Sequence, residues 1–147
     1  MKSYVIDASV AVKWYIPEPL SDAADKYLQL YKDKQAKLLA PDLLLVEVGS
    51  VLWKKTRTNE ITGDDARAIM QAFMVHCPVS MVRSGELLPS AYDLAMAQGL
   101  TVYDSVYLAL AIAAGAKLVT ADSEIVKLTK RSPFSEEVIL LKNNHQR

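Results

Sequence analysis

Short apolar runs alternate with longer amphipathic stretches along almost the whole chain, and this alternation limits the folds open to it. Five runs are too brief for helices and are predicted as strands: residues 3–6, 38–40, 79–82, 117–120 and 138–141. Strands that are separated by helical segments usually join a parallel sheet, because a parallel pair needs a crossover connection. The sequence therefore predicts an α/β fold, in which a small, about five-stranded parallel sheet is flanked by helices on both faces.

The intervening segments carry apolar residues at helical spacing. Helices are predicted over residues 10–15, 21–31, 41–58, 62–73, 84–99, 104–114 and 122–130. Gly99 and Gly115 follow two of them, as is typical of helix C-termini. Right-handed crossovers place the carboxyl ends of all strands at one edge of the sheet, which is where such folds carry their sites.

The 147 residues show no internal repeat, no linker and no break in composition, so residues 1–147 are expected to form one domain. The 17 basic and 17 acidic residues balance, which excludes the strongly basic surface of a non-specific nucleic-acid coat protein. A lone cysteine, Cys77, favours a reducing compartment. No uncharged apolar run approaches the roughly 20 residues of a membrane helix, and no signal peptide is recognisable. We expect a soluble, cytoplasmic protein.

Four acidic residues stand apart from the solvated ones. Asp7 and Asp122 end the first and fourth predicted strands, and Asp104 begins a helix that is otherwise almost wholly apolar. Taken singly, these three can be helix caps, since a carboxylate at a helix N-terminus accepts from free N–H groups. The fourth, Glu47, lies in the middle of an apolar helical segment.

Glu47 has no ordinary structural explanation. Its neighbours three and four positions away are Leu43, Leu44, Ser50 and Val51, so no cation lies within local pairing distance. An ionised carboxylate that is buried without a partner is costly. Its position implies a raised pKa or a cation supplied from elsewhere.

These four carboxylates are expected to meet at one edge of the sheet and to repel one another unless a divalent cation joins them. Oxygen ligands without a His or Cys cluster favour Mg²⁺ or Mn²⁺ over zinc, and both histidines, His76 and His145, are isolated. Such an ion activates water toward a phosphodiester or phosphate ester. Three basic clusters could flank the pocket: Lys32/Lys34/Lys37, Lys54/Lys55/Arg57 and Lys127/Lys130/Arg131.

Taken together, the four positions resemble those of PIN-domain proteins, and the compact chain resembles the toxin ribonucleases of toxin–antitoxin pairs (the VapC type). The matching pieces are Ile6-Asp7-Ala8-Ser9, the apolar helix that bears Glu47, the segment from Tyr103 to Ala111, and Thr120-Ala121-Asp122. They span nearly the whole chain in the family's order.

The resemblance implies an endoribonuclease that depends on Mg²⁺ or Mn²⁺. Asp7 and Asp104 would be the principal metal ligands, while Glu47 and Asp122 would complete the cluster by holding a second ion or orienting the attacking water. Ser9 would bond a ligating carboxylate or water, whereas a contribution from Glu124 is left open. The resemblance also implies an RNA substrate, a cognate antitoxin and a homodimer.

Two alternatives stay open. One keeps the fold without catalysis, as an interaction or regulatory domain whose acids serve only as caps. The other is a different phosphoryl enzyme, but a phosphatase of the haloacid-dehalogenase type would need Asp-x-Asp where this chain has Asp7-Ala8-Ser9. A receiver domain would need paired acids near the first strand, and that pattern is incomplete too.

Overall fold

The computed structural model describes residues 1–143 and contains one sheet of five strands. The strands are β1 (Lys2–Ile6), β2 (Ala36–Pro41), β3 (Val79–Val82), β4 (Lys117–Thr120) and β5 (Val138–Leu140). They lie in the order β3-β2-β1-β4-β5, and every neighbouring pair is parallel. The predicted parallel α/β fold is confirmed.

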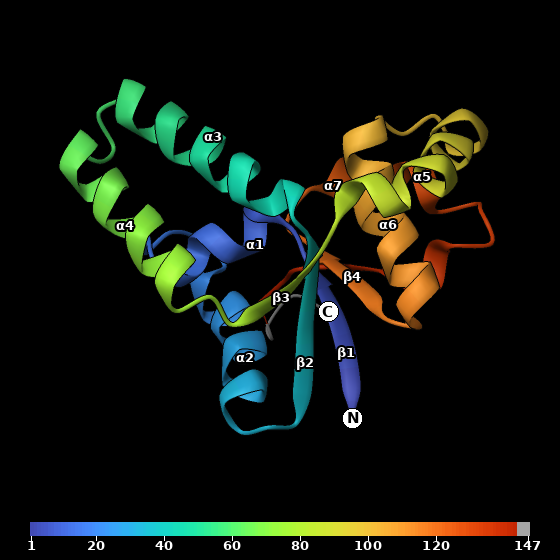
Figure 1. Ribbon diagram of the computed structural model, residues 1–147, viewed down its shortest axis with the longest axis horizontal. Coiled ribbons are helices and arrows are strands. Elements are labelled where there is room, and N and C mark those ends of the chain that lie inside the picture. Colours follow the sequence, from blue (N-terminus) through green and yellow to red (C-terminus); the bar gives the residue numbers. More distant parts are fainter. Residues whose placement is uncertain (144–147) are drawn as a thin grey trace.

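Helices cover the sheet on both sides (Figure 1). They are α1 (Ala8–Ala11), α2 (Ser21–Lys32), α3 (Leu43–Arg57), α4 (Gly63–Val75), α5 (Ser84–Gln98), α6 (Val102–Ala114) and α7 (Ser123–Thr129), with 3-10 turns at Val12–Trp14 and Ser135–Glu137. Helix α6 packs against β1, β2 and β4, and its residues 105–111 are all buried. Its almost continuous apolar sequence therefore reflects its central place in the core.

The strand order places a topological switch between β1 and β4. From β1 the chain adds β2 and β3 on one side, and later adds β4 and β5 on the other. Ile6 of β1 is in register with Val119 of β4, so these two central strands end side by side. In open α/β sheets this crevice is the usual place for a ligand. Asp7 directly follows β1, and Asp122 follows β4 after one intervening residue.

Three predicted helix starts are wrong by two residues each, and the first of these helices, predicted from residue 10, begins at Ala8. Residue 41 was predicted to open a helix, but Pro41 belongs to β2, where it pairs with Val82, and α3 begins at Leu43. The pairing with β3 extends the strand, because Asp42 N–H still donates to the Val82 carbonyl at 2.8 Å. Helix α6 likewise begins before Asp104.

The N-cap of α6 is Thr101, whose hydroxyl accepts from the Asp104 N–H at 3.0 Å. Threonine is a good N-cap residue, and it extends the helix by two residues that the apolar pattern alone did not show. Asp104 is therefore the third residue of the helix and not its cap. Its carboxylate is left free for another role.

Helices α3 and α4 form an antiparallel arm at the left of Figure 1. Leu44, Val48 and Leu52 bury one face of α3. Thr62 and Asp65 form the capping box at the start of α4 that the sequence predicted. The face of α3 opposite Leu44, Val48 and Leu52 therefore lies beside the carboxyl edge of the sheet.

Within residues 1–143, no single helix is long and apolar enough to cross a membrane. The pair α5 and α6 passes that test only jointly, with a bend of 112° between the two helices.

Candidate active site

A pocket of about 440 Å³ opens at the carboxyl edge of the sheet, and all four predicted acidic residues line it. Asp7 comes from the end of β1, Glu47 from α3, Asp104 from the first turn of α6 and Asp122 from the end of β4. The structure therefore brings together residues that are up to 115 positions apart in the chain.

Asp7 lies deepest, with 9% of its surface exposed. Its Oδ1 accepts from the Ser9 hydroxyl at 2.5 Å and from the Val10 N–H at 3.2 Å, so it also caps α1. Burial raises the pKa of this carboxyl to about 6, against the lowering effect of these donors, and the nearby charge of Glu47 raises it further. Asp7 thus keeps a proton more readily than an exposed aspartate.

Glu47 is half-buried and makes no ion pair within residues 1–143. Its Oε1 is fully buried and has no hydrogen-bond partner among those residues. Burial, together with the charge of Asp104, raises the pKa of Glu47. The position that the sequence left unexplained therefore holds a carboxylate oxygen without a partner, facing the other acids.

Asp104 and Asp122 form the outer part of the pocket. Burial raises the pKa of Asp104, and the charge of Asp122 adds to this. Asp122 is exposed and caps α7, since its Oδ1 accepts from the Glu124 N–H at 2.9 Å. Two of the acids, Asp7 and Asp122, thus do serve as caps, whereas Asp104 and Glu47 do not.

The carboxylates influence one another's pKa values in sequence. The charge of Glu47 raises the pKa of Asp7, the charge of Asp104 raises that of Glu47, and the charge of Asp122 raises that of Asp104. Groups that disfavour one another's ionisation in this way share one electrostatic environment. The pocket concentrates negative charge at the end of the sheet.

The side chains that line the pocket offer the kind of ligand atoms that a hard cation prefers. It offers carboxylate oxygens, one of them an orphaned buried atom, and no His or Cys. Yet within the described part of the chain no three His, Cys, Asp or Glu side chains are close enough to form a ready-made metal site. The acids share a pocket without converging on one point, so loading with a metal would require side-chain rotation.

Ser9 links two of the strands that end at the pocket. Its Oγ donates to Asp7 and accepts from the Ala121 N–H at 2.9 Å, which joins the end of β1 to the end of β4. The sequence anticipated the contact with a carboxylate but not the one with Ala121. The second contact depends on strand order, which no local pattern reveals.

Sequence reasoning missed two residues of the pocket. Tyr107 is buried on α6, and its hydroxyl has no hydrogen-bond partner within residues 1–143. Burial and the neighbouring Glu47 raise its pKa, so it stays a neutral phenol. Tyr103, one turn earlier and exposed, lines the mouth. The available signal was the spacing of four between Tyr103 and Tyr107 and of three between Asp104 and Tyr107.

Other candidates lie elsewhere. His76 is exposed at the end of α4, and His145 lies outside the described residues. Glu124 is exposed and does not line the pocket. Of the three basic clusters, only Lys54 reaches the pocket lining.

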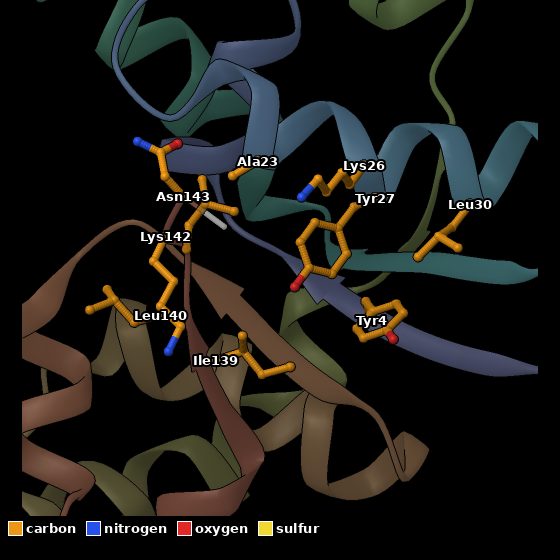
Figure 2. A pocket seen from close by; sticks show the side chains of 10 residues that line it. Tyr4, Ala23, Lys26, Tyr27, Leu30, Ile139, Leu140, Lys142 and Asn143 are labelled. Atoms are coloured by element: carbon orange, nitrogen blue, oxygen red, sulfur yellow. The ribbon is translucent and has the colours of Figure 1, made fainter. Parts of the chain in front are cut away.

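A larger cavity, of about 630 Å³, lies between α2 and the strands β1 and β5 (Figure 2). Tyr4 and Tyr27 meet there edge to face, with ring centroids 5.0 Å apart, and Lys26 and Lys142 contribute to its wall. The described residues that line it include no carboxylate. Size alone therefore does not make it the site for a hard cation.

Comparison with known proteins agrees with this geometry. The family model described as "PIN domain" matches residues 4–131. The ribonuclease VapC3 of Pyrobaculum aerophilum is 33% identical over 124 residues, which are 84% of this chain and 92% of that protein.

Two solved structures share the fold. PAE2754 from Pyrobaculum aerophilum superposes with a TM-score of 0.63 at 26% identity, over 88% of this chain and 81% of the other. VapBC2 from Rickettsia felis, solved bound to a DNA fragment from its promoter, gives a TM-score of 0.61 at 18% identity, over 94% and 96% of the two chains.

Proposed function

Because this chain belongs to the PIN-domain family and is similar to VapC ribonucleases, we propose that it is a metal-dependent endoribonuclease and the toxin of a toxin–antitoxin pair. The observation that carries the proposal is the pocket itself, which four carboxylates from four separate segments line together. In a domain that only binds a partner protein, Glu47 would be an unexplained cost, because its buried oxygen has no hydrogen-bond partner within residues 1–143.

In this proposal Asp7 and Asp104 hold Mg²⁺ or Mn²⁺, and Glu47 and Asp122 complete the acidic cluster. When bound, the ion supplies Lewis acidity toward a phosphate oxygen and lowers the pKa of the attacking water. Its positive charge would also offset the burial and the mutual repulsion that raise the pKa values of Asp7, Glu47 and Asp104.

The protein side chains supply position and proton transfer. Ser9 fixes Asp7 through its 2.5 Å hydrogen bond, which sets the direction of the Asp7 carboxylate. Glu47 lies beside the Tyr107 hydroxyl, which lowers the pKa of this carboxyl against the effect of burial, and in this proposal Glu47 accepts the proton that the attacking water loses. Asp122 is exposed at the mouth and orients water there.

The decisive experiment uses Asp7→Asn and Asp104→Asn. Each substitution keeps the size of the side chain and removes a ligand charge. Loss of even an outer-shell partner costs a metal site about 10–100-fold, so losing a direct ligand is expected to lower RNA cleavage by at least about a hundredfold. Cleavage of structured RNAs is measured with Mn²⁺ or Mg²⁺ and with a chelator.

Asp93→Asn is the matched control, because Asp93 is an exposed aspartate of α5 that does not line the pocket. It should cleave as the wild type does. Wild-type rates in both pocket variants, with folding confirmed by circular dichroism, would reject the site.

The alternative is a PIN-like interaction domain without catalysis. It is favoured by one observation, that Asp7 and Asp122 already act as helix caps. A titration with Mn²⁺ separates the two, since ligand binding to the folded state raises thermal stability. A chain that gains no stability from millimolar Mn²⁺ and cleaves no RNA would be an interaction module.

The proposal extends to partners and location. By its resemblance to the toxins, the protein is expected to act in the cytoplasm, to be held inactive by a cognate antitoxin, and to form a homodimer. Copurification with the product of a small neighbouring reading frame tests the antitoxin. If that product does not suppress RNA cleavage, the nuclease proposal stands and the antitoxin proposal is wrong.

A further inference from the structure

The basic run near the end of α3 divides among three different environments. Lys55 Nζ forms ion pairs with Glu18 Oε2 at 2.7 Å and with Glu60 Oε2 at 3.3 Å. The Arg57 guanidinium lies 4.8 Å from the centre of the Trp53 ring. Both cations thus have structural partners, and they are not available for a ligand without breaking those contacts.

Lys54 differs from its neighbours. It is exposed, lines the acidic pocket and makes no ion pair or side-chain hydrogen bond within residues 1–143. Among the described residues that line the pocket, it is the one with a positive charge. The described residues therefore include no group that the charge of Lys54 stabilises.

Helix geometry fixes where this charge lies. Six residues of α3 line the pocket at helical spacing: Leu43, Val46, Glu47, Ser50, Val51 and Lys54. Lys54 is seven positions after Glu47, which is close to two full turns, so the two lie on one face and about 10 Å apart along the axis. The wall of the pocket thus runs from a carboxylate at the cluster to an ammonium group at its far end.

We infer that Lys54 binds a backbone phosphate of the RNA, adjacent to the phosphate that is cleaved. The inference rests on the proposed ribonuclease function. A phosphodiester chain that enters the pocket must bring negative charge toward four carboxylates, and a cation about 10 Å along the wall favours one path for that chain. At this distance Lys54 serves a neighbouring phosphate and leaves the reacting one to the acidic cluster.

The choice of lysine fits this role. An ammonium group is a flexible, hydrated point charge that attracts phosphate without reading bases. Lys54 is therefore a positioning contact for substrate, and its loss should weaken RNA binding while the chemical step proceeds.

The first test is kinetic and uses Lys54→Ala and Lys54→Arg. Lys54→Ala should raise KM for a fluorescein-labelled 12-nucleotide RNA roughly tenfold, the cost of one charged phosphate contact of about 1.4 kcal/mol, and keep kcat within about twofold. Lys54→Arg keeps the charge and should restore most of the affinity. Lys32→Ala, an exposed lysine of α2 away from the pocket, is the matched control and should behave as the wild type.

The second test is the salt dependence of binding. The same RNA is titrated against Asp7→Asn protein, with and without Lys54→Ala, between 50 and 300 mM KCl. Removal of one phosphate contact should lower the slope of log K against log salt by about 0.7, as expected for a single strand. A purely structural role for Lys54 would not change this slope.

The outcomes separate the inference from the function it rests on. If the wild type neither binds nor cleaves RNA, the proposed function fails. If it cleaves while Lys54→Ala keeps the wild-type KM and salt slope, only the assignment of Lys54 is overturned. A fall in kcat at unchanged KM would also overturn it, since Lys54 would then act on the reacting phosphate.

Discussion

Asp7 is both a helix cap and a residue of the candidate active site. It caps α1, bonds Ser9, and lies buried at the base of an acidic pocket. A cap alone is most stable as a solvated anion, whereas burial here raises the pKa to about 6 from 3.8. The fold therefore holds a carboxylate where its charge is unfavourable, and the proposed cation would offset this cost.

This position predicts how the stability of the metal-free protein depends on pH. A carboxyl with a higher pKa in the folded than in the unfolded chain binds its proton more tightly when folded, so its contribution is full below about pH 4 and is lost as pH rises through 6. Asp7→Asn should therefore become more stable relative to wild type between pH 4 and pH 7, by on the order of 2–3 kcal/mol.

Urea unfolding in a chelator at several pH values measures this difference. Asp93→Asn serves again as the control, and its difference from wild type should stay flat. A constant difference for Asp7→Asn as well would show that Asp7 titrates like an exposed aspartate.

Glu47 shows how far a single residue can be interpreted without coordinates. Its apolar neighbours alone indicated a carboxylate without a local cation, and the structure confirms that it has no ion pair within residues 1–143. What the sequence did not reveal is the neighbour it does have. Tyr107 is 60 positions away in the chain but lies beside Glu47 in the pocket.

At the level of elements, the site depends on how β1 and β4 end. Ser9 lies three positions after the end of β1, in α1, and accepts a hydrogen bond from the Ala121 N–H, which directly follows β4. Ser9→Ala should lower the free energy of unfolding by about 1–2 kcal/mol, because it leaves the Ala121 N–H without this acceptor. It should also raise the pKa of Asp7 further, since the Ser9 hydroxyl lowers that pKa.

Ser9→Thr keeps the hydroxyl and is the matched comparison. Urea unfolding gives the stability, and a Mn²⁺ titration monitored by thermal unfolding gives the affinity, which should fall in Ser9→Ala and persist in Ser9→Thr. Equal stability and Mn²⁺ response in all three proteins would mean that the link between the strands contributes nothing.

The helices illustrate which boundaries local patterns can locate. The capping box of α4 and the glycines after α5 and α6 were predicted correctly, because each depends on residues within one turn. The starts of α3 and α6 were not. The start of α3 is set by the pairing of β2 with β3, whose residues are 41 positions further along the chain.

At the level of the whole molecule, α5 leaves an apolar face uncovered. Leu88, Tyr92 and Met96 are 49%, 55% and 71% exposed, and their spacing of four places them on one side of the helix. Exposed apolar stripes of this kind usually mark an interface, and the homodimer that the resemblance implies would cover this one.

Tyr92→Glu should therefore shift the protein from dimer to monomer, because it places a charge within the apolar stripe. Light scattering coupled to size-exclusion chromatography measures the mass, and Asp93→Asn on the adjacent face is the control. A monomeric wild type would contradict the dimer, and a dimeric Tyr92→Glu protein would place the interface elsewhere.

The sequence by itself determined the types of the elements and the identity of the acids. Hydrophobic periodicity reports which face of a segment is buried, and that depends on residues a few positions apart. Strand order, the register of β1 with β4, the link through Ser9 and the separate surroundings of Lys54, Lys55 and Arg57 were decided only by the tertiary structure. These features arise from contacts between distant segments, whose geometry is fixed only when the sheet assembles and buries its faces.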